Sequence, residues 1–361
     1  MFPKNAMQIT ELLNKRNLPL LTEVSGKSWE DKKQNIRMLL SEYEYGYLPE
    51  KPEHLSYAET LTDRKYLAGK CTRSEWTLTA VMHGRKVTFP VHAYIPKSDV
   101  PVPGFIHLSS QPKLFYEHTP VEEIIDRGYA LFDIYCADVA TDDQNFKKGC
   151  GSVLCTSRRP ASAPGKLALW AWAAMRVTDV LAARADIDTE NIAVIGLGRF
   201  GKAALVAGGF DERFRFVIAN NSGCCGAALS RGKTGESVAM ITKRFPYLFC
   251  PRFVRMAVEE NTIPFDQNYL LSLIPPRHLL VGSAEEDFLA DPVSEFLGVV
   301  SVNEVYRHYG MTGLVFPDEV PTAKTVLADG NAYYCIRRGS HFLGREDFAG
   351  YMDFIDRKTG R

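Results

Sequence analysis

Long apolar segments and an excess of charge of either sign are both missing from this sequence. Crossing a membrane as a helix takes about 18 or more consecutive apolar residues, and no segment approaches that length. Lysine and arginine together number 43, aspartate and glutamate together number 43, and the formal net charge is therefore zero. Such a balance provides no general attraction to nucleic acid or to an anionic membrane. We therefore expect no nucleic-acid or membrane partner, and the oligomeric state stays open.

Paired cysteine motifs are also absent. The eight cysteines include no Cys-x-x-Cys and no Cys/His group with zinc spacing, so the sequence predicts no metal site. Several lie in strand-like apolar segments, as Cys136 does, which is typical of buried, reduced thiols. Residues 1–8 contain no apolar segment of the kind that a secretory signal requires. These observations favour a cytoplasmic protein.

Predicted strands and helices alternate along most of the chain. Residues 1–55 show helical patterns interrupted by prolines, and we interpret them as an N-terminal helical extension. An antiparallel pair of strands, followed by strand–helix alternation, predicts an α/β domain over residues 56–361 with a mostly parallel sheet covered on both faces. No linker divides it. The eight expected strands are 76–84, 86–95, 104–110, 129–135, 191–195, 216–220, 278–282 and 332–336.

A glycine-rich turn between a strand and an Ala-rich helix is the most informative segment. Gly196, Gly198 and Gly201 together spell the Gly-x-Gly-x-x-Gly pattern of dinucleotide-binding proteins. That interpretation requires an acidic residue about 20 positions later, at the end of the next strand, to bind the ribose. The next strand ends instead in Asn220 and Asn221. We therefore expect no nicotinamide cofactor, and a dinucleotide-binding oxidoreductase is disfavoured.

The same strand–turn–helix also fits a nucleophile elbow, Gly-x-Ser-x-Gly. In that motif a strained turn lifts the middle side chain above the sheet, beside helix N-terminal amides that stabilise an oxyanion. Here the middle position is Gly198, which has no side chain to lift.

Longer motifs resemble the glucuronoyl esterase-like and acetyl xylan esterase-like carbohydrate esterases, whose fold is that of the α/β-hydrolases. The resemblance extends over about residues 30–354. It implies an α/β-hydrolase fold and a carbohydrate ester as substrate. The motifs lie at 122–128 (EEIIDRG), 169–176 (LWAWAAMR), 210–214 (FDERF), 222–228 (SGCCGAA), 231–236 (RGKTGE), 245–250 (FPYLFC), 264–267 (PFDQ), 283–287 (SAEED) and 339–341 (GSH).

The resemblance assigns catalytic positions, one of which has lost its functional group. Gly198 stands where the family has its nucleophilic serine. Arg199 matches the family's oxyanion-hole arginine, and His341 matches its base. We predict that His341 faces the turn at Gly198, because loops at the carboxyl ends of neighbouring strands build the sites of open α/β sheets.

The family's catalytic acid has two alternative places. One corresponds to Asn221, an amide that cannot carry the charge that stabilises an imidazolium. The other lies at the end of the strand near 278–284, where Glu285, Glu286 and Asp287 follow one another. We predict that Glu285 or Glu286 orients His341.

Four further positions match the family's sugar-binding region. Lys202 and Glu236 are retained. Leu289 replaces a tryptophan that many bacterial members have, and Phe288 stands beside it. The resemblance implies that these side chains contact a sugar.

The sequence therefore predicts a carbohydrate-esterase-like protein with a degenerate nucleophile elbow that lacks ordinary serine esterase activity. Its ligand is expected to be a uronate ester or an acetylated xylo-oligosaccharide. Two alternatives stay open. One is a non-catalytic homologue that binds a sugar or a partner protein; the other is a hydrolase whose nucleophile has moved to Cys224 or Ser222. His107, within an apolar strand, is interpreted as structural.

Overall fold

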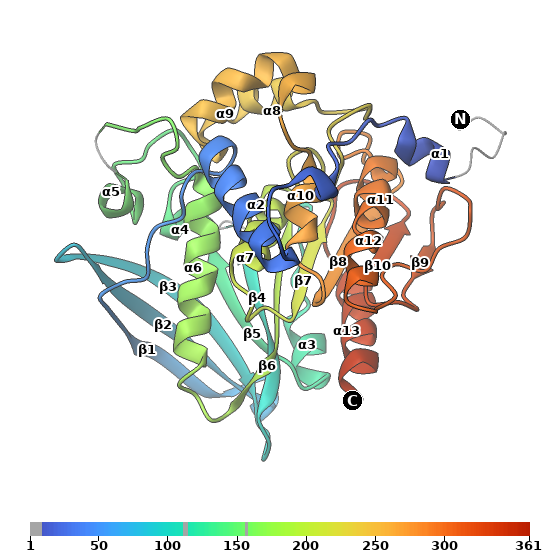
Figure 1. Ribbon diagram of the computed structural model, residues 1–361. Helices are drawn as coiled ribbons and strands as arrows, with labels where there is room; N and C mark the ends of the chain where they lie inside the picture. The colour runs from blue at the N-terminus through green and yellow to red at the C-terminus, as the bar shows by residue number, and fades with distance from the viewer. Residues whose placement is uncertain (1–8, 111–114, 156–157) are drawn as a thin grey trace.

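In the computed structural model, which describes residues 9–110, 115–155 and 158–361, ten strands form one twisted sheet (Figure 1). The strands are β1 (His54–Tyr66), β2 (Cys71–Met82), β3 (Arg85–Pro96), β4 (Val102–Ser109), β5 (Ala130–Tyr135), β6 (Ile187–Leu197), β7 (Phe216–Asn220), β8 (His278–Ala284), β9 (Thr325–Leu327) and β10 (Tyr333–Arg337). Their order is β1-β2-β3-β5-β4-β6-β7-β8-β10-β9. From β5 to β10 all neighbours are parallel, whereas β1–β3 and β9 join antiparallel. The predicted mostly parallel sheet is confirmed.

Helices occupy most of the connections between the parallel strands. Figure 1 shows α8 and α9 together at one end of the molecule, beyond the ends of the strands. The helices are α1 (Ile9–Asn14), α2 (Trp29–Tyr43), α3 (Val121–Asp126), α4 (Cys136–Val139), α5 (Gly151–Leu154), α6 (Lys166–Leu181), α7 (Arg199–Phe210), α8 (Val238–Arg244), α9 (Pro251–Met256), α10 (Gln267–Ser272), α11 (Pro292–Ser301), α12 (Asn303–His308) and α13 (Arg345–Thr359).

Alternate residues of each central strand enter two separate apolar cores. In β4, Ile106 and Leu108 belong to a cluster that includes Trp170 of α6, whereas Phe105 belongs to a second cluster with Phe348 of α13. This is the two-residue period of a strand that is covered on both faces. Burial on both faces explains why the central strands are almost continuously apolar in sequence.

Several elements differ from the sequence prediction. The sheet has ten strands in the described part of the chain rather than about eight, because β1 and β9 were not expected. Nearly every residue of β1 is exposed, so its sequence carries no apolar alternation that would identify a strand. Between β7 and β8 lie three short helices, α8, α9 and α10, each of seven residues or fewer.

The N-terminal helices pack on the main core. Ser28 and Asp31 form a capping box that starts α2, and Ile36 and Leu40 of this helix are buried in the larger core. The division of the chain into an N-terminal extension (1–55) and an α/β domain (56–361) remains a prediction. Residues 1–8, used to argue against a secretory signal, lie outside the described residues. Among the described helices, none combines the length and apolar character needed to cross a membrane.

Candidate active site

The turn between β6 and α7 has the backbone shape of a nucleophile elbow. Gly198 caps α7 with φ 57° and ψ −118°, a conformation that strains residues with a side chain. Its N–H donates to the carbonyl of Asn220 at 2.9 Å, which ties the turn to the end of β7. At Gly196 a Cβ atom would lie 2.4 Å from the carbonyl oxygen of Phe200, so the helix requires glycine there. The turn is therefore built as an elbow, with no side chain at its apex.

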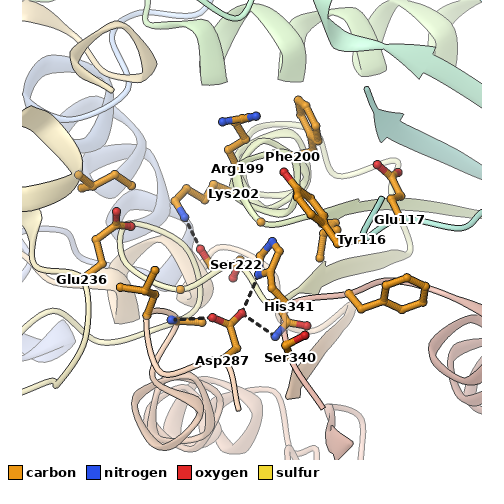
Figure 2. A pocket seen from close by; sticks show the side chains of 18 of the residues that line it. Tyr116, Glu117, Arg199, Phe200, Lys202, Ser222, Glu236, Asp287, Ser340 and His341 are labelled. Carbon is orange, nitrogen blue, oxygen red and sulfur yellow. Dashed lines mark hydrogen bonds and ion pairs between the residues drawn. The ribbon is translucent and has the colours of Figure 1, made fainter. Parts of the chain in front are cut away.

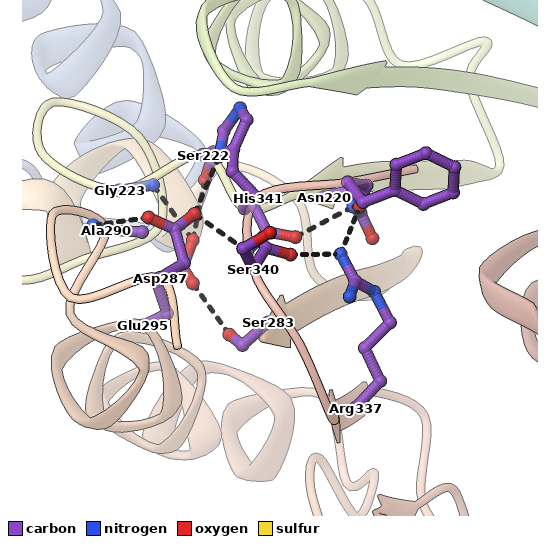
Figure 3. Close-up of polar contacts among 12 residues, drawn as sticks. Asn220, Ser222, Gly223, Ser283, Asp287, Ala290, Glu295, Arg337, Ser340 and His341 are labelled. Carbon is purple, nitrogen blue, oxygen red and sulfur yellow. Dashed lines mark hydrogen bonds and ion pairs between the residues drawn. The ribbon is translucent and has the colours of Figure 1, made fainter. Parts of the chain in front are cut away.

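His341 faces this apex. A Cβ atom built on Gly198 would lie 3.0 Å from Nε2 of His341, so the predicted facing of these two residues is confirmed. His341 follows β10, and the loop is held by Arg337, whose guanidinium donates to the carbonyls of Ser340 and Phe342 at 2.7 and 2.6 Å (Figure 3). The imidazole is thus presented on a loop with fixed backbone.

Asp287 is the acid that contacts His341. Its Oδ2 lies 2.6 Å from Nδ1 of His341 (Figure 3). The same oxygen accepts a hydrogen bond from the Asn221 side chain at 2.9 Å, and the N–H of Ala290 donates to Oδ1 at 3.3 Å. Burial raises the pKa of Asp287, but the interaction with His341 and the hydrogen bonds from Ala290 and Asn221 together outweigh it, so this pKa lies below its usual range. The carboxylate is therefore ionised and orients the imidazole through Nδ1.

The prediction that Glu285 or Glu286 orients His341 is wrong. Strand β8 continues to Ala284, and the next two N–H groups donate to the carbonyls of Arg337 and Gly339. Both glutamate side chains are exposed, and the following turn directs the third residue of the acidic run inward. Asn221, the alternative acid position, lies beside the same pair but acts as a hydrogen-bond donor to Asp287.

A cavity of about 560 Å³ opens over these residues (Figure 2). It brings together most of the side chains that the resemblance singled out, together with aromatic and basic residues from α8 and from the segment after β4. Among the lining residues are Tyr116, Glu117, Gly198, Arg199, Lys202, Asn221, Glu236, Arg244, Phe245, Asp287, Leu289 and His341. Phe288 is 74% exposed and lines a neighbouring cavity with Glu285, so the structure does not place it with the others.

Two cations approach the cavity from the first turn of α7. Arg199 pairs with Asp142, its Nη2 lying 3.0 Å from Oδ2, and its guanidinium lies 5.6 Å from the ring centre of Phe245. Asp142 also accepts a hydrogen bond from the Tyr247 hydroxyl at 3.1 Å. Lys202 is buried, and its ammonium donates to the carbonyl of Ser222. Positive charge at a helix N-terminus opposes the helix dipole, so the arrangement favours an anionic or strongly polar ligand opposite it.

Glu236 and Leu289, two further candidate sugar-binding residues, are neighbours in the cavity wall. The N–H of Glu236 donates to the carbonyl of Leu289 at 3.1 Å, which joins the segment before α8 to the loop after β8. Figure 2 shows Glu236 on the side of the cavity opposite Tyr116 and Glu117. The cavity therefore has carboxylates on two sides and cations at the start of α7.

Sequence reasoning missed a second buried cluster next to this cavity. His107 lies between two carboxylates, with Nε2 3.1 Å from Glu117 and Nδ1 3.2 Å from Asp133. Burial lowers the pKa of His107, but both carboxylates outweigh it and raise this pKa to about 9. The Ser109 hydroxyl also donates to Asp133, at 2.5 Å. Through His107, this cluster connects Asp133 on β5 to Glu117, which lines the cavity.

The proposed alternative nucleophiles are engaged elsewhere. The Ser222 hydroxyl lies 3.4 Å from Glu295 and accepts from the N–H of Ala227 at 2.9 Å. Cys224 is buried, with its sulfur 3.8 Å from that of Cys225. Burial raises the pKa of Glu295 to about 7, so this carboxyl is a weak acid beneath the site. Among the described residues, no group of three His, Cys, Asp or Glu side chains could hold a metal ion.

Comparisons with known proteins identify the fold and the family. Two solved structures superpose over nearly the whole chain: a glucuronoyl esterase from Solibacter usitatus (TM-score 0.84, 28% identity, 94% of this chain and 97% of the other) and a CE15 glucuronoyl esterase from Teredinibacter turnerae (TM-score 0.87, 26% identity, 96% and 90%). These likenesses and the mixed, mostly parallel sheet define an α/β-hydrolase. The family model described as "Glucuronyl esterase, fungi" matches residues 78–310. The chain belongs to the glucuronoyl esterase family of carbohydrate esterases.

Two curated relatives show the range of similarity. A carbohydrate esterase from an unknown prokaryotic organism is 30% identical over 380 aligned residues, which cover 92% of this chain and 85% of the relative. A 4-O-methyl-glucuronoyl methylesterase from Phanerochaete carnosa is 25% identical over 292 residues, which cover 78% of this chain and 68% of the relative.

Proposed function

We propose that this protein binds a uronate-bearing sugar, as the acid or its ester, in the cavity beside Gly198, and that it does not use a serine acyl-enzyme. One observation carries the proposal: the His341 ring, oriented by Asp287, faces a position that has no side chain, with Nε2 3.0 Å from where a Cβ would lie. A base and its orienting acid are present, but the elbow provides no oxygen for covalent attack. The elbow is therefore degenerate.

The ligand class follows from the charges around the cavity and from the relatives. Arg199 and Lys202 lie at the start of α7, and Arg244 lines the same cavity, so a carboxylate or ester carbonyl finds positive charge there. Glu236 supplies an acceptor for sugar hydroxyls on the other side. Several curated relatives are named 4-O-methyl-glucuronoyl methylesterases, which supports a uronate rather than an acetylated sugar.

The alternatives of a relocated nucleophile have less support. Activation of Cys224 or Ser222 requires a base within hydrogen-bond reach. The Ser222 hydroxyl is buried and engaged by Glu295 and by the N–H of Ala227, and Cys224 is packed in the core beside Cys225. The alternative of a partner-binding protein has no specific observation in its favour.

Calorimetric titration with glucuronate and with a methylglucuronate-bearing xylo-oligosaccharide tests binding. We expect both to bind the wild type and to bind Glu236→Gln more weakly, because the amide loses the charge on the acceptor. Glu286→Gln is the matched control, since it removes one carboxylate from an exposed position outside the cavity. A serine-directed fluorophosphonate should leave the wild type unlabelled. Failure of both sugars to bind, or labelling of the wild type, would refute the proposal.

A further inference from the structure

Lys202 is a cavity cation whose side chain is almost completely buried. It lies in the first turn of α7 and lines the cavity, yet it is only 5% exposed. Its ammonium donates to the carbonyl of Ser222 (Figure 2), and the other two N–H groups have no hydrogen-bond partner among the described residues. Burial of a charge without a counter-ion is costly. An ammonium at this position therefore requires negative charge nearby.

Glu295 supplies that charge through a single peptide group. The carbonyl of Ser222, which accepts from Lys202, and the N–H of Gly223 belong to the same peptide group. This N–H donates to Oε1 of Glu295 at 2.9 Å, and the Ser283 hydroxyl donates to Oε2 at 2.6 Å (Figure 3). A charged donor on one side and a charged acceptor on the other polarise the peptide group in the same direction, which strengthens both hydrogen bonds. Lys202 and Glu295 therefore form a buried ion pair with one peptide group between them.

Glu295 acts from behind the cavity wall. It lies in the first turn of α11, is fully buried and is not among the residues that line the cavity. Asp287 and Asp291, from the loop after β8, and Tyr334 of β10 also face it, and burial raises the pKa of Tyr334, which is therefore uncharged. Burial raises the pKa of Glu295 to about 7, and the charge of Lys202 opposes this rise. The carboxyl can therefore influence a ligand only through Lys202 and through its field.

We infer that Glu295 is a positioning residue for Lys202: through the Ser222–Gly223 peptide group it holds the ammonium and offsets its charge, so that the cavity favours a neutral uronate ester over the free uronate. The two free N–H groups of Lys202 serve ester or hydroxyl oxygens. A free carboxylate gains less from the ammonium, because the negative charge of Glu295 opposes it. The choice of ligand rests on the proposed function, whereas the pairing of Lys202 with Glu295 does not.

Calorimetric titration with glucuronate and with its methyl ester tests this role at pH 6 and pH 8, about one unit on either side of the Glu295 pKa. Glu295→Gln keeps an oxygen for the N–H of Gly223 and removes only the charge. At pH 8 it should bind glucuronate about three- to tenfold more tightly than the wild type does, the effect of one charge across a peptide group. At pH 6 the two proteins should agree within about twofold, and the methyl ester should bind both alike at either pH. Glu286→Gln, which removes an exposed carboxylate outside the cavity, is the matched control.

A second substitution shows whether the effect passes through Lys202. In a Lys202→Met background, Glu295→Gln should no longer change glucuronate affinity, because burial without the ammonium keeps the carboxyl protonated. An effect that persists in that background would overturn the inference. Equal affinities of the wild type and Glu295→Gln for glucuronate at pH 8, or equal tightening for acid and ester, would overturn it as well.

Failure of the inference can be told apart from failure of the proposed function. If neither sugar binds any of these proteins, the proposed function is refuted, and urea denaturation at pH 8 still tests the pair. The urea midpoint of the double variant should then fall by less than the sum of the two single losses, and additive losses would overturn the inference. If Glu295→Gln fails to fold, Ser283→Ala takes its place. It removes a donor to the ionised carboxyl, so the pH at which glucuronate affinity falls should rise by about one unit, and an unmoved profile would overturn the inference.

Discussion

Replacement of Gly198 by serine should supply the attacking hydroxyl that the elbow lacks, at a measurable cost in stability. The apex keeps φ 57° and ψ −118°, and a side chain in such a conformation costs about 1–3 kcal/mol. The new Cβ would lie 3.0 Å from Nε2, so the His341 ring must move by a few tenths of an ångström. We expect the free energy of unfolding to fall by about 1–3 kcal/mol, measured by urea denaturation. Gly198→Ala should lose about the same amount, because it adds the same Cβ.

The difference between the two variants isolates the hydroxyl. Gly198→Ser should react with a serine-directed fluorophosphonate and show a burst with benzyl glucuronate, because His341 can then deprotonate the serine. Gly198→Ala should show neither, and Gly198→Ser combined with His341→Ala should lose both. The gain should be partial, since Asn221 and Leu289 remain unlike the family and residues of one site act as a unit. A folded Gly198→Ser that stays unlabelled, or labelling that persists without His341, would refute the assignment of the elbow.

Three further predictions address the acid, the buried cluster and the arginine. Added to Gly198→Ser, Asp287→Asn should lower turnover by up to about 10⁴-fold, as expected for an orienting acid, whereas Glu286→Gln added to Gly198→Ser should leave it unchanged; equal effects would contradict the assignment. The pKa of His107 is raised from 6.5 to about 9, so its stabilising contribution of about 3 kcal/mol should be complete below pH 6.5 and lost as the pH rises through 9. Urea midpoints from pH 6 to 10 should fall accordingly, and His107→Gln should flatten this part of the profile; an unchanged slope in that variant would exclude His107 as its source. Asp142→Asn should tighten glucuronate binding about two- to fivefold in calorimetry, because Arg199 loses a competing carboxylate, and weaker binding would argue that Asp142 positions the guanidinium instead.

Local patterns in the sequence indicated the turn at Gly198, whereas the resemblance to the carbohydrate esterases was needed to single out His341. Glycines at fixed spacing between an apolar strand and an Ala-rich helix indicate the turn at Gly198, whatever function it has. His341 lies after the last parallel strand, at the sheet edge where the loops of such folds converge. That Gly198 and His341 lie at the same edge of the sheet follows from the parallel direction of their strands, which the alternation of strands and helices predicts.

The orienting acid could not be chosen from sequence because three acidic residues follow one another. Which of Glu285, Glu286 and Asp287 points inward depends on where β8 ends and on how the next backbone groups pair with the loop after β10. A shift of one residue changes the direction of each side chain. That detail is a property of the tertiary structure.

The buried histidine cluster was missed for a related reason. His107 and Asp133 are paired partners on the parallel strands β4 and β5, and Glu117 comes from the segment after β4. The three residues do not belong to one sequence motif. The register between β4 and β5 brings His107 and Asp133 together. Burial of a charged group requires such partners, but the sequence of a single strand does not reveal them.

The edges of the sheet have a consequence for self-association. A strand with one neighbour leaves unpaired N–H and C=O groups that can pair with the edge of another molecule. The long edge strand β1 is exposed along nearly its whole length, yet Glu59, Asp63, Arg64 and Lys65 bring charge of both signs, and its register with β2 shifts after Glu59 and again after Asp63. The opposite edge, β9, spans only three residues. Charge and irregular pairing on one side and a very short strand on the other therefore limit edge-to-edge growth of the sheet from one molecule to the next.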